Sequence, residues 1–385
     1  MIKDAAYWIT LAHIPGWGYA KINSLVVKFH HEMSLSITEF FAMDESQLTG
    51  VINLSGEEAT ALNEARKEVP GNAFLAESME NQGYELIPIV SELYPKTLKE
   101  NLKSSHSPPL LYIKGEQSIL TEKSLAIVGS RTAGEVSLRF TDNIAKLASK
   151  EFKVIVSGFA KGVDKQALDS AVKHLGKSII VLPQGIMTFA SGFKTYYKEI
   201  QEGNVLVLST FFPKAPWKVE LAMARNSIIY GLANEIFVAE SGETGGTWQG
   251  VMAGIKRGRK IFIRMPEAGE KNANLLLIQK GAIAVDDDGN VIDTKQNPVL
   301  NTLPLETGSE EFDKKILSVF NGGSLSAKEI SDKLGLDWSA QKLSKHLKSN
   351  PAIKTMKDKK SGTNHYALKE QLPDPQTELF GSPDS

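Results

Sequence analysis

The stretch LAIVGSRTAGE, Leu125 to Glu135, decides the fold expected for this chain. An apolar strand runs into Gly129, Ser130 and Arg131, and a helix pattern opens directly afterwards. A dinucleotide-binding turn carries glycines in G-x-G-x-x-G spacing, whereas here one glycine stands in the turn and a permanently charged guanidinium follows it. We therefore expect this turn to face an anionic ligand other than NAD.

Further apolar runs follow this strand along the chain. They cover residues 153–157, 178–182, 204–209, 235–239 and 260–264, with amphipathic stretches between them. Strands without polar alternation, joined by helices, are typical of a parallel sheet that is covered on both faces. The pattern predicts an α/β fold in which residues 124–300 form a Rossmann-like, doubly wound parallel sheet.

The segments before this core have a different character. Residues 1–80 show helical spacing and predict a small helical domain. Its joint, His13 to Gly18, resembles a helix-hairpin-helix turn of the kind that approaches nucleic-acid phosphates, but a plain tight turn between core helices is the favoured alternative. Residues 81–123, with their prolines and serines, predict a linker and an extension to the core.

Three helix patterns and a hairpin pattern follow the core, which is the order of a winged helix. Residues 309–370 carry 12 lysines against 8 acidic residues, and Lys357, Lys359 and Lys360 fall at the expected wing. DNA contact and a solvated or protein-docking face are equally compatible with this charge. The polar, proline-broken tail of residues 371–385 is expected to be disordered.

Composition bounds the function further. The 385 residues carry a net charge of −1, so any contact with nucleic acid depends on local clusters of the 44 lysines and arginines. The absence of cysteine excludes disulfides and cysteine nucleophiles, and the seven histidines lie largely outside the strand ends, so we expect no metal site. We find no signal-peptide pattern and no apolar stretch long enough for a membrane span, and we expect a cytoplasmic protein.

The loops that follow the strands carry the candidate site. In an open parallel sheet, ligands bind outside the carboxyl ends of the strands, where amides at helix starts and an arginine would hold a phosphate. Glycine turns that merely close the βα units are the alternative. The candidates in these loops are Gly129, Ser130, Arg131, Ser157, Gly158, Phe159, Lys161, Gly162, Ser241 and Gly242.

Catalytic residues are not evident in these loops. Asp164 stands at a helix start, where we expect it to cap the helix, and Glu220 reads as a surface residue or a partner of Arg225. There is no P-loop motif and no convincing acid–base pair, so no cofactor and no enzymatic activity are expected.

Several of these motifs together resemble the DprA (Smf) family of DNA-processing proteins. The resemblance rests on Tyr94-Pro95, on PPLLYIKG at residues 108–115, on Gly129-Ser130-Arg131 and on S-G-x-A-x-G-V-D at residues 157–164. Arg225-Asn226 falls where the family has Arg-Asn-Arg, and Ser241-Gly242 where it has a Ser-Gly loop. The order of helical domain, Rossmann-like core and winged helix is also similar.

The resemblance implies a dimeric, non-enzymatic protein that binds single-stranded DNA and loads the RecA recombinase on it. It assigns DNA phosphates to the glycine-rich loops and the arginine, which here means Ser130, Arg131, Ser157, Gly158, Lys161, Arg225 and Asn226. Leu168 and Ser227 depart from the family pattern. A relative that serves housekeeping recombination or phage defence rather than transformation would fit the same residues.

Two other functions of the protein stay open. The glycine-rich strand ends also resemble LOG-type phosphoribohydrolases, but Trp248, Gln249 and Gly250 stand where their catalytic glutamate is expected, so a nucleotide sensor fits better than a hydrolase. A winged-helix regulator of duplex DNA is the second alternative. If the protein binds single strands, four aromatic side chains are candidate platforms for base stacking, with packing in the core as the alternative. They are Phe159, Phe211, Phe212 and Trp217.

The tail contains a short motif of its own. Gln376-Thr377-Glu378-Leu379-Phe380 resembles the Q-x-x-L-F peptide by which bacterial proteins dock to the replication sliding clamp. Gln376, Leu379 and Phe380 are therefore candidate clamp-binding residues.

Overall fold

The architecture is taken from a computed structural model of the chain. It describes residues 4–267, 269–293, 310–320, 323–336, 339–350, 352–357 and 363–368. The chain divides at residue 295 into two compact units, which are described separately. The tail of residues 371–385, with the candidate clamp-binding residues Gln376, Leu379 and Phe380, lies outside the described residues, as do Lys359 and Lys360.

The N-terminal segment is helical, as the sequence predicts. Its helices are α1 (Ala5–Ala12), α2 (Tyr19–Val26), the π-helical η1 (Val27–Glu32), α3 (Ile37–Ala42), α4 (Glu45–Gly50), α5 (Gly56–Arg66) and α6 (Val69–Asn81). Reciprocal capping boxes start three of these helices, with Ser36, Asp44 and Ser55 as the N-cap residues. Trp8, Phe29 and Phe40 lie in the core that the helices share with one end of the sheet.

The joint between α1 and α2 packs against the sheet. His13 is half-buried, its Nε2 lies 2.8 Å from the Tyr112 hydroxyl, and desolvation lowers the pKa of His13 to about 4. Ile14 is buried, and Gly16 supplies the positive φ of +79° that the turn requires. This arrangement is what the tight-turn interpretation predicts.

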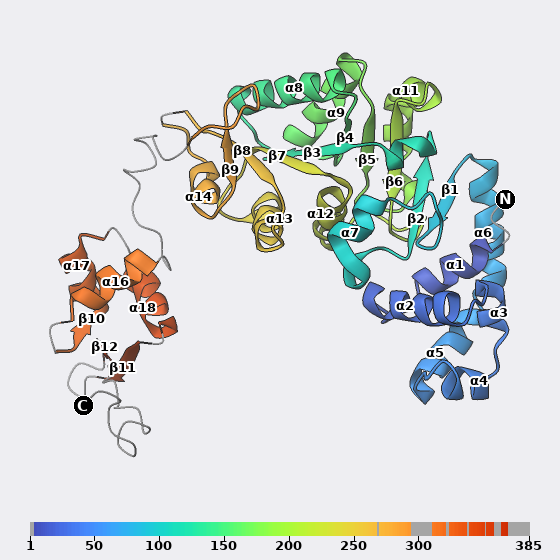
Figure 1. Cartoon of the computed structure of the whole chain (residues 1–385), viewed down its shortest axis with the longest axis horizontal. Coiled ribbons are helices and arrows are strands. Elements are labelled where there is room, and N and C mark those ends of the chain that lie inside the picture. The colour runs from blue at the N-terminus through green and yellow to red at the C-terminus, as the bar shows by residue number, and fades with distance from the viewer. Residues whose placement is uncertain are drawn as a thin grey trace, which may run out of the picture. The chain divides into compact units, whose positions relative to one another are not determined.

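The described strands of residues 1–295 form one nine-stranded sheet in the order β1-β2-β6-β5-β4-β3-β7-β8-β9. Strands β3 to β9 are parallel, while β1 and β2 form an antiparallel edge (Figure 1). The strands are β1 (Glu85–Pro88), β2 (Leu110–Lys114), β3 (Ser124–Gly129), β4 (Val154–Ser157), β5 (Ser178–Val181), β6 (Val205–Ser209), β7 (Glu235–Glu240), β8 (Ile261–Arg264) and β9 (Ile283–Val285). Every apolar run singled out in the sequence is one of these strands.

The prediction of a linker at residues 81–123 is wrong in part. This segment contributes β1, β2 and helix α7 (Lys96–His106) to the first unit, so the extension to the core is confirmed and the linker is not. The prolines mark strand ends rather than an unstructured connection, because Pro88 ends β1 and Pro108 and Pro109 precede β2. The Tyr94 hydroxyl donates a 2.8 Å hydrogen bond to the Pro108 carbonyl and fixes this segment on the sheet.

Helices cover both faces of the sheet. Helices α8 and α9 lie on one face and α7 and α12 on the other (Figure 1). The helices of this part are α8 (Glu135–Lys150), α9 (Val163–Lys173), α10 (Ala190–Thr195), α11 (Tyr197–Gln201), α12 (Val219–Leu232), α13 (Gly245–Lys256) and α14 (Asn274–Gln279), with 3-10 turns at Gln117–Thr121 and Ile186–Thr188. No helix among the described residues is long and apolar enough to cross a membrane.

The strand order reverses beside β3. From β3 the chain builds outward through β4 and β5 to β6, and it then returns to the other side of β3 to form β7, β8 and β9. The helices that follow β3 and β7 therefore leave the sheet toward different sides, and a crevice opens outside the carboxyl ends of these two strands. Doubly wound sheets bind their ligands at this switch point.

The second unit contains α16 (Glu310–Ser318), β10 (Leu325–Ser326), α17 (Ala327–Leu334), α18 (Ala340–Ser349), β11 (Ile353–Lys357) and β12 (Asn364–Leu368). Its strands pair in the order β10-β12-β11 around a core that includes Phe312, Ile330, Leu343 and Tyr366. The predicted helices and hairpin are present. The two-residue strand β10 was missed because it is too short to show a hydrophobic period.

Candidate functional site

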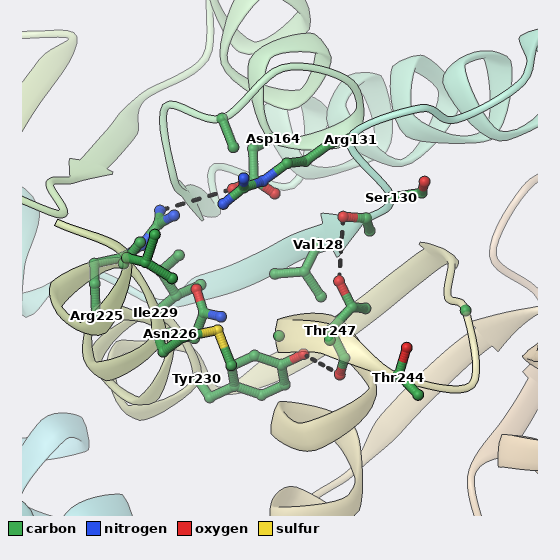
Figure 2. A pocket seen from close by; sticks show the side chains of 18 residues that line it. Val128, Ser130, Arg131, Asp164, Arg225, Asn226, Ile229, Tyr230, Thr244 and Thr247 are labelled. Carbon is green, nitrogen blue, oxygen red and sulfur yellow. Dashed lines mark hydrogen bonds and ion pairs between the residues drawn. The ribbon is translucent and has the colours of Figure 1, made fainter. Parts of the chain in front are cut away.

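A cavity of about 430 Å³ lies at the switch point, outside the carboxyl ends of β3 and β7. The loop after β3, the loop after β7 and one side of α12 form its walls (Figure 2). The structure brings together six of the predicted site residues here, from three separate segments of the chain. They are Gly129, Ser130, Arg131, Arg225, Asn226 and Gly242.

Three of the other predicted side chains are directed elsewhere, and their assignment to the ligand is wrong. Ser157 is fully buried and donates a 2.7 Å hydrogen bond to the Ile127 carbonyl. Ser241 is buried, and its amide donates to Asn274 Oδ1 at 3.0 Å. The ring of Phe159 packs edge-on against Phe189, with 4.9 Å between ring centroids, and it is partly buried against the core.

The glycines of the 157–164 loop shape the cavity rather than line it. A Cβ atom on Gly158 would lie 1.5 Å from Arg225 Nη1, so this position admits no side chain. Gly162 has a φ of +78°, and a Cβ there would lie 2.3 Å from the Ser130 carbonyl oxygen. Lys161 is exposed on the same loop but does not line the cavity.

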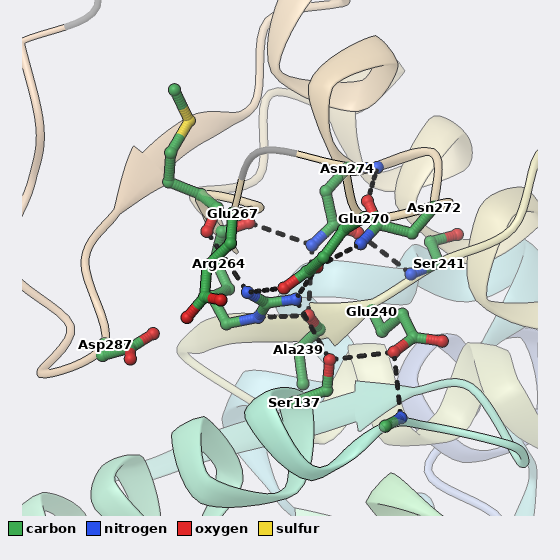
Figure 3. A network of polar contacts seen from close by, with 12 residues as sticks. Ser137, Ala239, Glu240, Ser241, Arg264, Glu267, Glu270, Asn272, Asn274 and Asp287 are labelled. Carbon is green, nitrogen blue, oxygen red and sulfur yellow. Dashed lines mark hydrogen bonds and ion pairs between the residues drawn. The ribbon is translucent and has the colours of Figure 1, made fainter.

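The first turn of α8 is already occupied by an anion from the protein itself. Glu240, the last residue of β7, accepts hydrogen bonds from the Gly134 amide at 3.3 Å and from the Ser137 hydroxyl at 2.9 Å (Figure 3). The expectation that this helix start would bind a phosphate is therefore wrong. At the start of α13, by contrast, the N-cap Thr244 makes no side-chain capping bond and Gly245 has a φ of +91°. This second helix start offers its amides to the cavity.

A buried ion pair forms the floor of the cavity. Arg225 is 3% exposed, and its Nη1 lies 3.7 Å from Asp164 Oδ2 and donates to the Val181 carbonyl at 3.2 Å (Figure 2). Burial raises the pKa of the Asp164 carboxyl to about 6, although Arg225 and Arg131 oppose this shift. Burial also lowers the pKa of Arg225. The separation of 3.7 Å exceeds that of a close charge-assisted hydrogen bond, so the pair offsets its desolvation only in part.

This pair corrects two expectations from the sequence and decides between the two alternatives for Glu220, which is a surface residue. Asp164 does not cap α9, because Gly162 is the N-cap residue and Asp164 lies in the first turn. Glu220 is exposed, and the partner of Arg225 is Asp164. Arg225 was expected to hold a phosphate, but its burial at the floor makes it a support for the site.

The sequence did not indicate the residues of the opposite wall. The Thr247 hydroxyl donates to the Gly129 carbonyl at 3.2 Å, and the Tyr230 hydroxyl reaches the Thr247 carbonyl at 3.4 Å (Figure 2). Tyr230 lies four residues, or about one helical turn, after Asn226, so the two side chains share a face of α12. This spacing was the feature of the sequence that could have indicated Tyr230. The Asn226 amide points into the cavity and has no hydrogen-bond partner within the described residues, which leaves it available for a ligand.

A polar network behind the cavity fixes the end of β7. Arg264 is fully buried and donates to the Ala239 carbonyl and the Ser137 hydroxyl, each at 3.1 Å, and it pairs with Glu270 (Figure 3). The Asn274 amide donates to the same Ala239 carbonyl at 3.1 Å. Since the 241–247 loop leaves the sheet at this point, the network holds that loop in place.

These features define the class of the protein. It is an α/β protein with a large, mostly parallel, doubly wound sheet and an open pocket at its switch point, which Arg131 and Asn226 line. The chain belongs to the DNA recombination-mediator protein A family, whose family model matches residues 85–296. The family resemblance inferred from the sequence is confirmed.

Individual relatives agree with this assignment. The chain is 31% identical over 219 residues to the DNA processing protein DprA of Streptococcus pneumoniae, an alignment that covers 56% of this chain and 76% of the relative. It is 29% identical over 235 residues to DprA of Bacillus subtilis, which covers 59% and 76%. The X-ray structure of DprA from Streptococcus pneumoniae matches 78% of this chain and 97% of its own, with a TM-score of 0.58 at 22% identity, and so shares the fold.

Proposed function

We propose that the protein binds single-stranded DNA in the pocket at the switch point and acts as a recombination mediator. The observation that carries the proposal is the convergence, in one cavity, of Arg131, the uncapped start of α13 and the free amide of Asn226. The first two suit a phosphate, and the amide suits the edge of a base. A base held inside a duplex would not reach Asn226 within the cavity, so an unpaired strand is the fitting ligand.

Membership of the family supports DNA as the ligand class. On this basis we extend the proposal to a homodimer in the cytoplasm that loads the RecA recombinase on single strands. The order of elements in the second unit supports a winged helix, in which the exposed Lys357 of β11 would lie at the start of the wing. Docking of the tail to the sliding clamp, and the choice between transformation and housekeeping or defence roles, remain proposals from the sequence motifs.

We propose that the pocket binds rather than catalyses. Of the described residues that line it, Asp164 is the only one with a carboxylate, and this carboxylate is buried and paired with Arg225. Trp248 and Gln249 occupy the part of α13 where a LOG-type hydrolase would carry its glutamate. Acid–base catalysis needs an accessible group whose pKa suits the reaction, and this pair offers none to solvent.

Replacing Arg131 by alanine tests the proposal. Arg131 is exposed at the rim, so its removal is expected to leave the fold intact and to weaken binding to oligo-dT. Each lost phosphate contact lowers the slope of log affinity against log salt by roughly 0.7 on single strands. Fluorescence anisotropy of labelled oligo-dT and of the corresponding duplex, across a salt series, measures both quantities.

Arg139→Ala is the matched control, because Arg139 is an exposed arginine of α8 that pairs with Asp287 outside the cavity. It is expected to bind as the wild type does. An unchanged slope in Arg131→Ala would remove Arg131 from the site. Failure of the wild-type protein to bind either strand form would refute the proposal and leave a small nucleotide as the ligand to test.

A further inference from the structure

A second hollow continues from the pocket. It has a volume of about 180 Å³ and shares Met223, Asn226, Tyr230 and Gly246 with the larger cavity. From these shared residues it follows the seam between α12 and α13 and ends at Arg257 and Arg259. We call this hollow the α12–α13 groove. The two hollows are therefore adjacent, and Asn226 and Gly246, which lie against each other, belong to their common wall.

Glycines of α13 explain why this groove is open. Gly246, Gly250 and Gly254 recur every four residues and so lie on one face of the helix. A Cβ atom would lie 2.6 Å from the Tyr230 ring at Gly250, and 2.6 Å from the Ile261 side chain at Gly254. The two helices therefore meet closely, and no side chain of these glycines rises from the seam. The Asn226 and Tyr230 side chains lie against Gly246 and Gly250, so these glycines let α12 pack closely on α13 along the groove.

The lining of the groove mixes apolar side chains, such as Leu102 and Met223, with small and polar ones. Ser227, Gln249 and Ala253 are exposed along it, and none of its described lining residues is a carboxylate. An anionic chain would meet no like charge along this path, whereas the pocket floor holds Asp164. With no carboxylate among its described lining residues and Arg257 and Arg259 at its end, the groove suits an anionic chain better than a basic ligand.

Four cations in five residues stand at the far end, Lys256-Arg257-Gly258-Arg259-Lys260. Arg259 is engaged in the fold, because it donates to the Tyr230 carbonyl at 2.9 Å and also to the Ala233 carbonyl beyond the end of α12. The guanidinium of Arg257 is exposed and has no partner among the described residues. A cation in the last turn of a helix complements the helix dipole. In α13 Lys256 already supplies this charge, so the dipole does not account for Arg257, the C-cap residue.

We infer that a single strand seated in the pocket continues along the α12–α13 groove and that Arg257 binds one of its phosphates. The inference rests on the proposed function. Gly246 and Arg257 are eleven residues apart on α13, which corresponds to about 16 Å along the helix. At the axial rise of about 3.4 Å per nucleotide in a stacked strand, this distance spans about 5 nucleotides, and fewer when the strand is stretched.

Binding of a short and a long strand distinguishes the two ends of this path, which are the pocket and Arg257. We expect Arg257→Gln to leave the affinity for a two-nucleotide oligo-dT unchanged and to weaken binding of a twenty-nucleotide oligo-dT, with the salt slope reduced by roughly 0.7. Arg131→Ala is expected to weaken both lengths. Lys150→Gln is the matched control, because Lys150 is an exposed cation in the last turn of α8. Competition anisotropy against a labelled strand measures all four proteins.

Substitutions within the groove provide a second readout. Ala253 is exposed on the lining, so Ala253→Glu is expected to weaken binding of the long strand and Ala253→Lys to strengthen it, with little effect on the short one. The inference is overturned if Arg257→Gln binds the long strand as the wild type does while Arg131→Ala does not, and the proposed function then stands. A loss that is equal for both lengths also overturns it. If the wild-type protein binds neither length, the proposed function itself fails.

Discussion

Replacing Arg225 by methionine is expected to lower the free energy of unfolding by about 3–5 kcal/mol at pH 8, the range found when one partner of a buried ion pair is removed. Arg225 is 3% exposed, and its guanidinium faces Asp164 and the Val181 carbonyl. Without it, Asp164 keeps a buried charge whose nearby counterion is the exposed Arg131, and the Val181 carbonyl loses a donor. Methionine is unbranched and fills much of the vacated volume, so a large cavity is not the cause of the loss.

Urea unfolding at pH 8 and at pH 5 measures this prediction. The loss is expected to be smaller at pH 5, because Asp164 is then protonated and leaves no buried charge. The double variant Asp164→Asn, Arg225→Met should recover much of the stability at pH 8, since it removes both charges. Arg139→Met, an exposed control, should change stability by about 0.5 kcal/mol or less. A double variant no more stable than Arg225→Met would show that the ion pair is not the reason for the loss.

The parallel sheet could be predicted because its signal is local. Each of the strands β3 to β8 is a short apolar run without polar alternation, such as Ile155 and its neighbours in β4, and each is buried on both faces. The loops between these runs supply glycines at the strand ends. Since all parallel strands end at the same edge, the location of the pocket followed from the sequence without knowledge of the strand order.

The direction of individual side chains could not be predicted in the same way. Ser130 and Ser157 both stand at the end of an apolar run, yet Ser130 lines the cavity and Ser157 bonds to Ile127 of the neighbouring strand. The difference is that Ser157 is still within β4, whereas Ser130 lies one residue beyond β3. A shift of one residue reverses the face of a strand, and strand ends are the least certain part of a sequence prediction.

Contacts that depend on the strand order were also beyond the sequence. Glu240 reaches the first turn of α8 because β7 lies beside β3, although the two are far apart in the chain. Asp164 lies in the first turn of α9 and Arg225 within α12, and the fold brings both residues to the switch point, where they pair. Local reasoning made Asp164 a cap and Arg225 a phosphate ligand, and it did not single out Glu240. The sheet order gives them partners instead.

The stability of the protein is expected to depend on pH through Asp164. The pKa of this carboxyl rises from 3.8 to about 6 on folding, chiefly because of burial. Below pH 3.8 the carboxyl is protonated in both the folded and the unfolded chain. Between 3.8 and about 6 the folded protein retains a proton that the unfolded chain has released, so the free energy of unfolding falls as the pH rises through this window. The shift corresponds to a total of about 3 kcal/mol.

Other carboxyls titrate in the same range, and a comparison with Asp164→Asn removes their contribution. Asparagine resembles the protonated carboxyl in shape and carries no charge, so the variant should lose this pH dependence alone. Wild-type stability minus that of Asp164→Asn, from urea unfolding between pH 4 and pH 7.5, should fall by about 2.4 kcal/mol as the pH rises, because part of the total change already occurs below pH 4. If the difference instead increases with pH, the pair with Arg225 outweighs burial and the pKa of Asp164 is lowered. In that case the ion pair between Asp164 and Arg225 at the pocket floor would stabilise the folded protein rather than lower its stability.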